Sequence, residues 1–178
     1  HSESGPHELL QFLVITLAAI AALRLMVMKE VRKNVYLFAW SAIAFAASVY
    51  VAGEEMSWGQ HILQWESSEY WKALNDQGET NLHNTSSWLD QKPRLLLEIG
   101  VIVGGVIMPL LRRFKPDTLP EKFKIIYPTY HVIPSAIVVL AVTILDKIDD
   151  QLEGISIFER ASEVEELYMF YFVLLYLI

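Results

Sequence analysis

The chain has 178 residues, a formal net charge of −7 and no cysteine. The absence of cysteine excludes a disulfide framework, thiolate metal ligands and a thiol nucleophile, and the acidic balance argues against nucleic acid as a partner. Hydrophobic residues make up 53% of the chain, and they lie in blocks long enough to cross a lipid bilayer. At this length we expect a single domain, residues 1–178, embedded in a membrane.

Five apolar runs in chain order predict an all-α fold, a polytopic bundle of transmembrane helices. About 20 helical residues cross the hydrocarbon core of a bilayer. The fifth run stops after 12 residues, so we expect it to be a truncated span. The residues before the first run lack the basic start of a signal peptide, and His1 is not expected to be the native start. The predicted spans are residues 9–28, 35–53, 95–111, 125–145 and 167–178.

The connection between the second and third predicted spans, residues 54–94, is much longer than an ordinary loop. It contains four of the chain's five tryptophans, Trp58, Trp65, Trp71 and Trp88. Tryptophan gathers in the headgroup layer of membranes, so we predict a Trp-rich interfacial segment here rather than a free linker. Two stretches of it are expected to be helical, Met56–Leu63 and Glu69–Leu74.

The charges of the connections predict which side of the membrane each occupies. The links after the first and third spans sum to +2 and +3, whereas residues 54–94 and 146–166 sum to −4 and −6. Short basic links stay in the cytoplasm. We therefore expect the N-terminus and both acidic segments to lie outside, in contact with the lipid bilayer and with any membrane partner protein.

The residues that follow the second span, Gly53–His61, bring several polar side chains to the mouth of the bundle. If the helix continues through them, Glu54, Ser57 and His61 share one face. A serine beside acids and an imidazole could support hydrolysis through an activated nucleophile or a metal-bound water, with Glu54, Glu55 and Ser57 as the catalytic candidates. In the alternative, Ser57 bonds back to its own helix and the charged groups simply meet water. We favour the functional interpretation for the two acids and the solvated one for His61.

Glu79 and His83 are spaced as neighbours on a helix, i and i+4. A carboxylate and an imidazole form a partial ligand set for zinc, iron or manganese. Asn81 and Asn84 flank the histidine and are expected to orient it or to cap a turn. The alternative, a solvated helix face, is held equally open. Further metal ligands would come from Glu54 or Glu55, or from the acidic cluster Glu163, Glu165 and Glu166.

Glu98 lies inside the third predicted span, where an unpaired carboxylate is costly. Its expected partners are Arg94 one turn earlier, a bound cation, or His83. Pairing with Arg94 would make Glu98 structural, whereas a cation or proton held there would indicate transport. Glu163 and Glu166, on the same predicted side, either complete the polar site or stabilise the first turn of a helix.

The strings GEEMSWGQ, residues 53–60, and GETNLHN, residues 78–84, resemble the signature of a family of bacterial multi-pass membrane proteins of uncharacterised activity. The resemblance implies an inner-membrane location, extends loosely to Glu163–Glu166, and often has arginine where this chain has His61. A fainter likeness is to intramembrane metal hydrolases typified by alkaline ceramidases. It covers only Ser57-xxx-His61, because this chain has no His-xxx-His pair.

Three functions fit these residues. The first is an outward-facing, metal-dependent hydrolase of a lipid or other amphiphile, in which Glu79, His83 and one acid of the Glu54–Glu55 pair hold the metal while the other acid is the general base. The second is a non-enzymatic scaffold or assembly subunit, which binds a partner protein through its acidic rim and its tryptophans. The third is a cation or proton carrier that uses Glu98.

Overall fold

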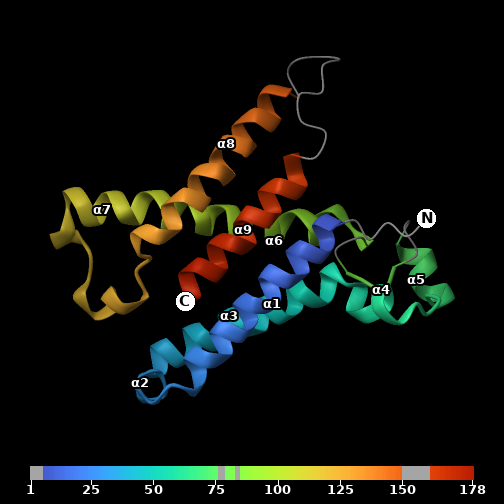
Figure 1. Cartoon of the computed structure of the whole chain (residues 1–178), viewed down its shortest axis with the longest axis horizontal. Coiled ribbons are helices and arrows are strands. Elements are labelled where there is room, and N and C mark those ends of the chain that lie inside the picture. The colour runs from blue at the N-terminus through green and yellow to red at the C-terminus, as the bar shows by residue number, and fades with distance from the viewer. Residues whose placement is uncertain (1–5, 76–78, 83–84, 150–160) are drawn as a thin grey trace. The chain divides into compact units, whose positions relative to one another are not determined.

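The computed structural model describes residues 6–75, 79–82, 85–149 and 161–178. Throughout these ranges the regular elements are helices, and no strand occurs among them (Figure 1). The predicted all-α fold is confirmed to that extent. The chain divides into two compact units, His1–Leu96 and Leu97–Ile178, and each is described by itself.

The first unit is built on a hairpin of two long helices, α1 (Pro6–Val27) and α3 (Val35–Glu55), which pack along each other (Figure 1). The chain reverses through the short helix α2 (Lys29–Lys33). The side chain of Asn34 then accepts two backbone N–H groups of the first turn of α3, at 3.0 and 3.3 Å. Because a helix start leaves such groups without a partner inside the helix, this cap fixes where α3 begins.

The α1–α3 hairpin buries mainly small side chains and leaves many large apolar ones exposed, although Ile15 is buried. Ala18, Ala22 and Ser48 are buried, whereas Ile20 and Ile43 are 58% and 65% exposed. Small residues let two helix backbones approach closely inside a membrane. A protein folded in water more often buries its isoleucines. The arrangement is therefore that of a hairpin surrounded by lipid.

The chain turns sharply where α3 ends, at Glu55. The three residues of the next turn, η1 (Ser57–Gly59), all have positive φ, at 45°, 54° and 101°. Left-handed backbone cannot continue a right-handed helix, so the predicted helix Met56–Leu63 is wrong. Only its last turn is helical, as α4 (Gln60–Leu63). The second helix predicted in this connection is confirmed as α5 (Glu69–Leu74).

The second unit is entered through α6 (Ser87–Ile102), which continues through a π-helical turn, η3 (Val103–Ile107), into α7 (Met108–Phe114). Helices α8 (Ile133–Asp149) and α9 (Ala161–Leu177) pack along each other. Three short 3₁₀ turns join α7 to α8, namely η4 (Pro116–Thr118), η5 (Glu121–Ile126) and η6 (Tyr130–Val132). The buried core of this unit consists of Val101, Val132, Ala136, Val139, Met169 and Phe172.

The π-helical turn η3 is the place where α8 comes closest to the α6–α7 rod. A Cβ atom on Gly105 would overlap the Cβ of Ala136 in α8. Pro109, four residues later, has no N–H to donate to the carbonyl of Gly105. Just before this proline, Met108 donates its N–H to the carbonyl of Val103, five residues earlier, which is the spacing of a π-helical turn. Glycine and proline together therefore shape this contact.

Four helical stretches in the described ranges are long and apolar enough to cross a membrane: His7–Val27, Val35–Glu55, Gln91–Phe114 and Phe123–Asp149. They correspond to the first four predicted spans. Helix α9, which includes the fifth apolar run, has 17 residues and is not among the four. The fifth span and the interfacial position of the Trp-rich segment stay predictions.

Candidate functional site

The two sequence motifs, residues 53–60 and 79–82, bind each other through hydrogen bonds that link distant parts of the chain. The backbone N–H of Leu82 donates to Oε2 of Glu54 at 2.7 Å, across 28 residues. The hydroxyl of Ser57 donates to Oε2 of Glu79 at 3.0 Å. These contacts and their neighbours form one network, here called the polar latch. Its members are Glu54, Ser57, Gln60, Ser67, Asn75, Glu79, Thr80 and Asn81.

Glu54 anchors the latch to the end of α3. Its side chain is 5% exposed. One carboxylate oxygen accepts the indole N–H of Trp58 at 2.7 Å, and the other accepts the N–H of Leu82. Hydrogen bonds to both oxygens offset the cost of burying this polar group.

Trp58 reaches Glu54 because the turn η1 folds it back over α3. Its ring lies against the α-carbon of Gly53, where an added Cβ would come within 2.9 Å of the indole. It also meets the ring of Tyr50 edge-on, with the ring centroids 6.3 Å apart. The positive φ of Trp58, 54°, is a strained conformation for a large side chain. The contacts to Glu54, Gly53 and Tyr50 stabilise it.

Ser57, Glu79 and Asn81 form a closed triangle at the centre of the latch. The amide nitrogen of Asn81 donates to the Ser57 oxygen at 3.1 Å and to Oε2 of Glu79 at 2.6 Å. Ser57 and Asn81 have no exposed surface. Each of these three contacts uses a separate hydrogen, since Asn81 has two amide hydrogens and Ser57 has one. The triangle therefore forms without two contacts competing for one hydrogen.

Asn75 supports the triangle from the end of α5. Its amide nitrogen donates to the backbone carbonyl of Glu79 at 3.0 Å and to the side-chain oxygen of Asn81 at 2.8 Å. Like Asn81, it has almost no exposed surface. Sequence reasoning missed Asn75; its only signal was a polar residue directly after the predicted helix Glu69–Leu74.

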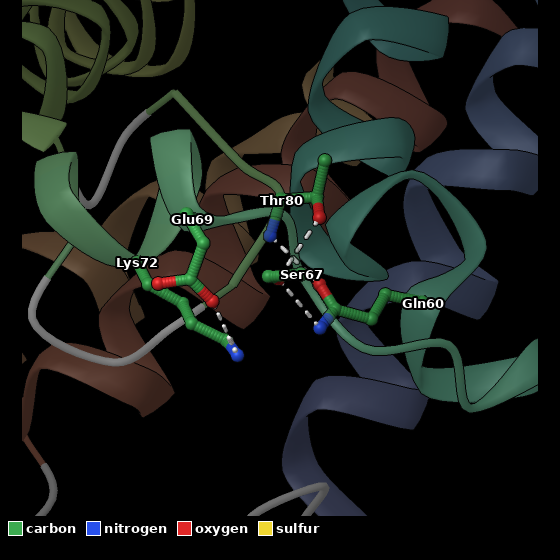
Figure 2. A network of polar contacts seen from close by, with 5 residues as sticks. All are labelled: Gln60, Ser67, Glu69, Lys72 and Thr80. Carbon is green, nitrogen blue, oxygen red and sulfur yellow. Dashed lines mark hydrogen bonds and ion pairs between the residues drawn. The ribbon is translucent and has the colours of Figure 1, made fainter.

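A second branch of the latch runs through Gln60, Ser67 and Thr80 (Figure 2). Gln60 accepts the backbone N–H of Thr80 at 2.7 Å and donates its amide N–H to Ser67 at 2.9 Å. The hydroxyls of Ser67 and Thr80 are 3.2 Å apart. Beside this branch, Figure 2 shows the exposed ion pair of Lys72 with Glu69, whose charged atoms are 3.3 Å apart. The sequence predictions also missed these three latch residues.

The predicted helical spacings within the site are wrong. The turn η1 interrupts the stripe expected through Glu54, Ser57 and His61. Residues 79–82 are not helical, so the i, i+4 argument for Glu79 and His83 fails over that segment. Glu54 and Ser57 nevertheless lie in one network with Glu79, through long-range contacts that spacing does not reveal.

The remaining predicted site residues fall into three groups. Glu55 is half-buried at the last residue of α3. His61 belongs to α4, but its side chain, like the whole of His83 and Asn84, lies outside the described residues. Three acids belong to the second unit, where all are half-buried: Glu98 on α6, and Glu163 and Glu166 on α9.

The predicted metal site stays a prediction. Within the part of the chain that is described, no group of three or more histidine, aspartate or glutamate side chains could hold a metal ion. Of the proposed pair only Glu79 is described, and its Oε2 accepts hydrogen bonds from Ser57 and Asn81.

Comparison of the chain with protein-family models, curated proteins and solved structures finds no match.

Proposed function

We propose that this chain is an integral membrane protein that serves as a scaffold or assembly subunit. Its segment 53–82 binds a partner protein at the outward-facing side of the membrane. The observation that carries this proposal is the state of the candidate catalytic groups. Glu54 and Ser57 are buried and hydrogen-bonded inside the latch, so they hold the segment in one shape rather than meeting a substrate.

Ser57 makes the argument concrete. A serine nucleophile needs a base that takes its proton and an open approach for the substrate. The Ser57 hydroxyl has no exposed surface, and the amide of Asn81 occupies one of its lone pairs. A substrate would reach this oxygen only after the latch had opened.

The outside of the same segment has the composition of a binding surface. Trp58, Leu63 and Tyr70 are 50%, 72% and 68% exposed, and aromatic residues are enriched at the centres of protein interfaces. The connection 54–94 carries a formal charge of −4. A partner with an apolar patch bordered by basic residues, itself held at the membrane, matches both features.

Site-specific photocrosslinking in the native membrane tests this function. A benzoylphenylalanine at Tyr70 should give one discrete protein adduct, identified by mass spectrometry, that also forms from position Leu63. The same probe at Ile43, on the lipid-facing side of α3, is the matched control and should give lipid adducts only. Lipid adducts alone at all three positions would contradict a protein partner.

A metal-dependent hydrolase is the second candidate, and one contact favours it. Leu82, the residue before His83, donates its backbone N–H to Glu54, while Glu79 is held in the same latch. Glu54, Glu79 and Leu82 thus belong to one network, and the two carboxylates with the imidazole of His83 would offer oxygen and nitrogen ligands to zinc, iron or manganese. The metal would supply an activated water for hydrolysis.

Elemental analysis of the purified protein by plasma mass spectrometry separates the two candidates. Near-stoichiometric zinc, iron or manganese that is lost in His83→Ala would favour the hydrolase. Metal content unchanged between wild type and His83→Ala, with a discrete crosslinked partner, would favour the scaffold.

A further inference from the structure

The segment from the end of α7 to the start of α8, residues 112–132, here called the α7–α8 link, is rich in basic side chains (Figure 1). It joins two apolar stretches long enough to cross a membrane, Gln91–Phe114 and Phe123–Asp149. When both stretches span the bilayer, residues 115–122 between them lie at its surface, among the lipid headgroups. Residues 112–124 hold five of the chain's 14 basic residues and two acidic ones. The link therefore carries a net positive charge at the level of the lipid phosphates.

Side-chain contacts hold the α7–α8 link in one shape. Arg112 donates from Nη1 to the backbone carbonyl of Pro128 at 2.8 Å, across 16 residues, and its guanidinium lies 5.6 Å from the ring centroid of Tyr130. The hydroxyl of Tyr176 in α9 donates to the backbone carbonyl of Ile126 at 2.8 Å. The link is thus fixed to both α7 and α9. A fixed backbone loses little conformational freedom when its side chains bind a ligand.

Three other basic side chains of the link are exposed, namely Arg113, Lys115 and Lys124. The ammonium nitrogen of Lys124 lies 3.5 Å from a carboxylate oxygen of Glu121, and both side chains of this pair are exposed. An exposed ion pair contributes little free energy, so a phosphate group can replace the carboxylate of Glu121. Arg112 holds the link together, whereas these three cations face outward.

Large apolar side chains lie next to these cations in the chain. Phe114 and Ile125 are 74% and 69% exposed, and the guanidinium of Arg113 lies 6.0 Å from the ring centroid of Phe114. A segment in the headgroup layer has this composition, because its apolar side chains enter the acyl boundary while its cations stay at the phosphates. An acidic protein in water would be matched by the charges alone. The exposed apolar residues and the two neighbouring stretches favour lipid.

We propose that the α7–α8 link binds the headgroups of anionic phospholipids through Arg113, Lys115 and Lys124. Guanidinium and ammonium groups donate charge-assisted hydrogen bonds to phosphate oxygens. One basic residue beside an anionic membrane surface strengthens binding by about fivefold. This lipid site belongs to the second unit and requires only that the chain is embedded in a membrane, so it is independent of the partner proposed for segment 53–82.

Fluorescence quenching in lipid nanodiscs tests the proposal. Because the chain has no cysteine, Thr129→Cys, at an exposed position of the link, gives a single site for a bimane dye. Nanodiscs of phosphatidylcholine then receive a small fraction of phosphatidylglycerol or phosphatidylcholine with a nitroxide on one acyl chain. We expect the anionic lipid to associate with the dye site at least about fivefold more strongly. Equal quenching by the two lipids, as expected if the link binds an acidic protein instead, would overturn the proposal.

Two matched double variants of the labelled protein locate the preference. Arg113→Gln with Lys115→Gln should lower the preference for phosphatidylglycerol by about fivefold or more. Lys72→Gln with Lys92→Gln removes the same charge from exposed positions of the connection 54–94 and should leave the preference unchanged. A preference that survives the first pair, or that the second pair also abolishes, would overturn the proposal.

Salt supplies a test that needs no further substitution, and it holds even if the double variant of the link folds poorly. Salt screens exposed charges, so a high concentration of sodium chloride should bring quenching by phosphatidylglycerol down towards that by phosphatidylcholine. A preference that salt leaves unchanged would show that the basic side chains do not cause it, and would overturn the proposal.

Discussion

Three hydrogen bonds meet on the side chain of Asn81, which has no exposed surface. It donates to Ser57 and Glu79 and accepts from Asn75. An amide supplies two donors and an acceptor in one plane, and the short asparagine side chain places all three within the latch. The residue therefore links a buried serine, a carboxylate and a second amide through one side chain.

Asn81→Ala should lower the free energy of unfolding by about 2 kcal/mol or more, because it leaves buried polar groups unsatisfied. For a chain of this size the unfolding midpoint would fall by about 4–8 °C. Thermal unfolding in detergent, followed by tryptophan fluorescence, measures this change. Glu69→Ala, which breaks only the exposed pair with Lys72, is the control and should cost less than about 1 kcal/mol. Equal midpoints for the two variants would contradict a structural latch.

Gly53→Ala should also destabilise the protein, by about 1–3 kcal/mol. The new methyl group would lie 2.9 Å from the Trp58 ring, so the indole must move away from α3. It would then lose its 2.7 Å hydrogen bond to Glu54. A changed near-ultraviolet circular dichroism signal, together with the lower midpoint, would report the displaced ring; an unchanged spectrum would show that the turn tolerates a side chain here.

Each unit contains one close helix contact made by small residues, and the two contacts differ. In the first unit alanine and serine line a regular interface between α1 and α3. In the second unit Gly105 sits in a π-helical turn that meets Ala136 of α8. A helix interface without side-chain bulk is held by close backbone approach and van der Waals contact, which makes it sensitive to one added carbon atom.

Gly105→Ala and Gly100→Ala form a matched pair of substitutions in one continuous helical rod. The first adds a Cβ that overlaps Ala136, whereas the second adds one with nothing within 4 Å. We expect Gly105→Ala to destabilise the protein by more than about 1 kcal/mol. Gly100→Ala should leave it unchanged or stabilise it by up to about 1 kcal/mol, since alanine favours a helix over glycine. In thermal unfolding, the midpoint of Gly105→Ala should be lower than that of Gly100→Ala. The reverse order would contradict the close contact between Gly105 and Ala136.

Hydropathy was enough to predict the long helices, because a chain in lipid must satisfy its backbone hydrogen bonds within each helix. The same sequence located both motifs of the latch. It did not reveal their pairing, since contacts across 22 to 28 residues depend on the fold. It also missed the turn at Ser57, because two residues other than glycine adopt positive φ there against their intrinsic preference.

At the scale of the whole molecule, charge is unevenly distributed among the links that connect and follow the four apolar stretches. Basic links alternate with acidic connections: +2 and +3 against −4 and −6. From this alternation the positive-inside rule predicts an orientation with the latch outside. Because the chain has no cysteine, a single introduced cysteine reports the side of each link without any background.

Glu69→Cys should react with a membrane-impermeant maleimide in intact cells, because it lies in the acidic connection predicted to be outside. Asp117→Cys, in the basic link between α7 and α8, should react only after the membrane is permeabilised. Both side chains are exposed, so accessibility within the protein does not differ between them. Labelling in the opposite order would reverse the proposed orientation.

The hydrogen bonds of Glu54 also impose an order in time. The ribosome adds its first partner, Trp58, four residues after Glu54, and its second partner, Leu82, 28 residues after it. During synthesis α3 is therefore complete well before the segment that closes over its end. The hydrogen bond from Leu82 to Glu54 can form only after Leu82 has emerged, and only then can the end of α3 reach its final state.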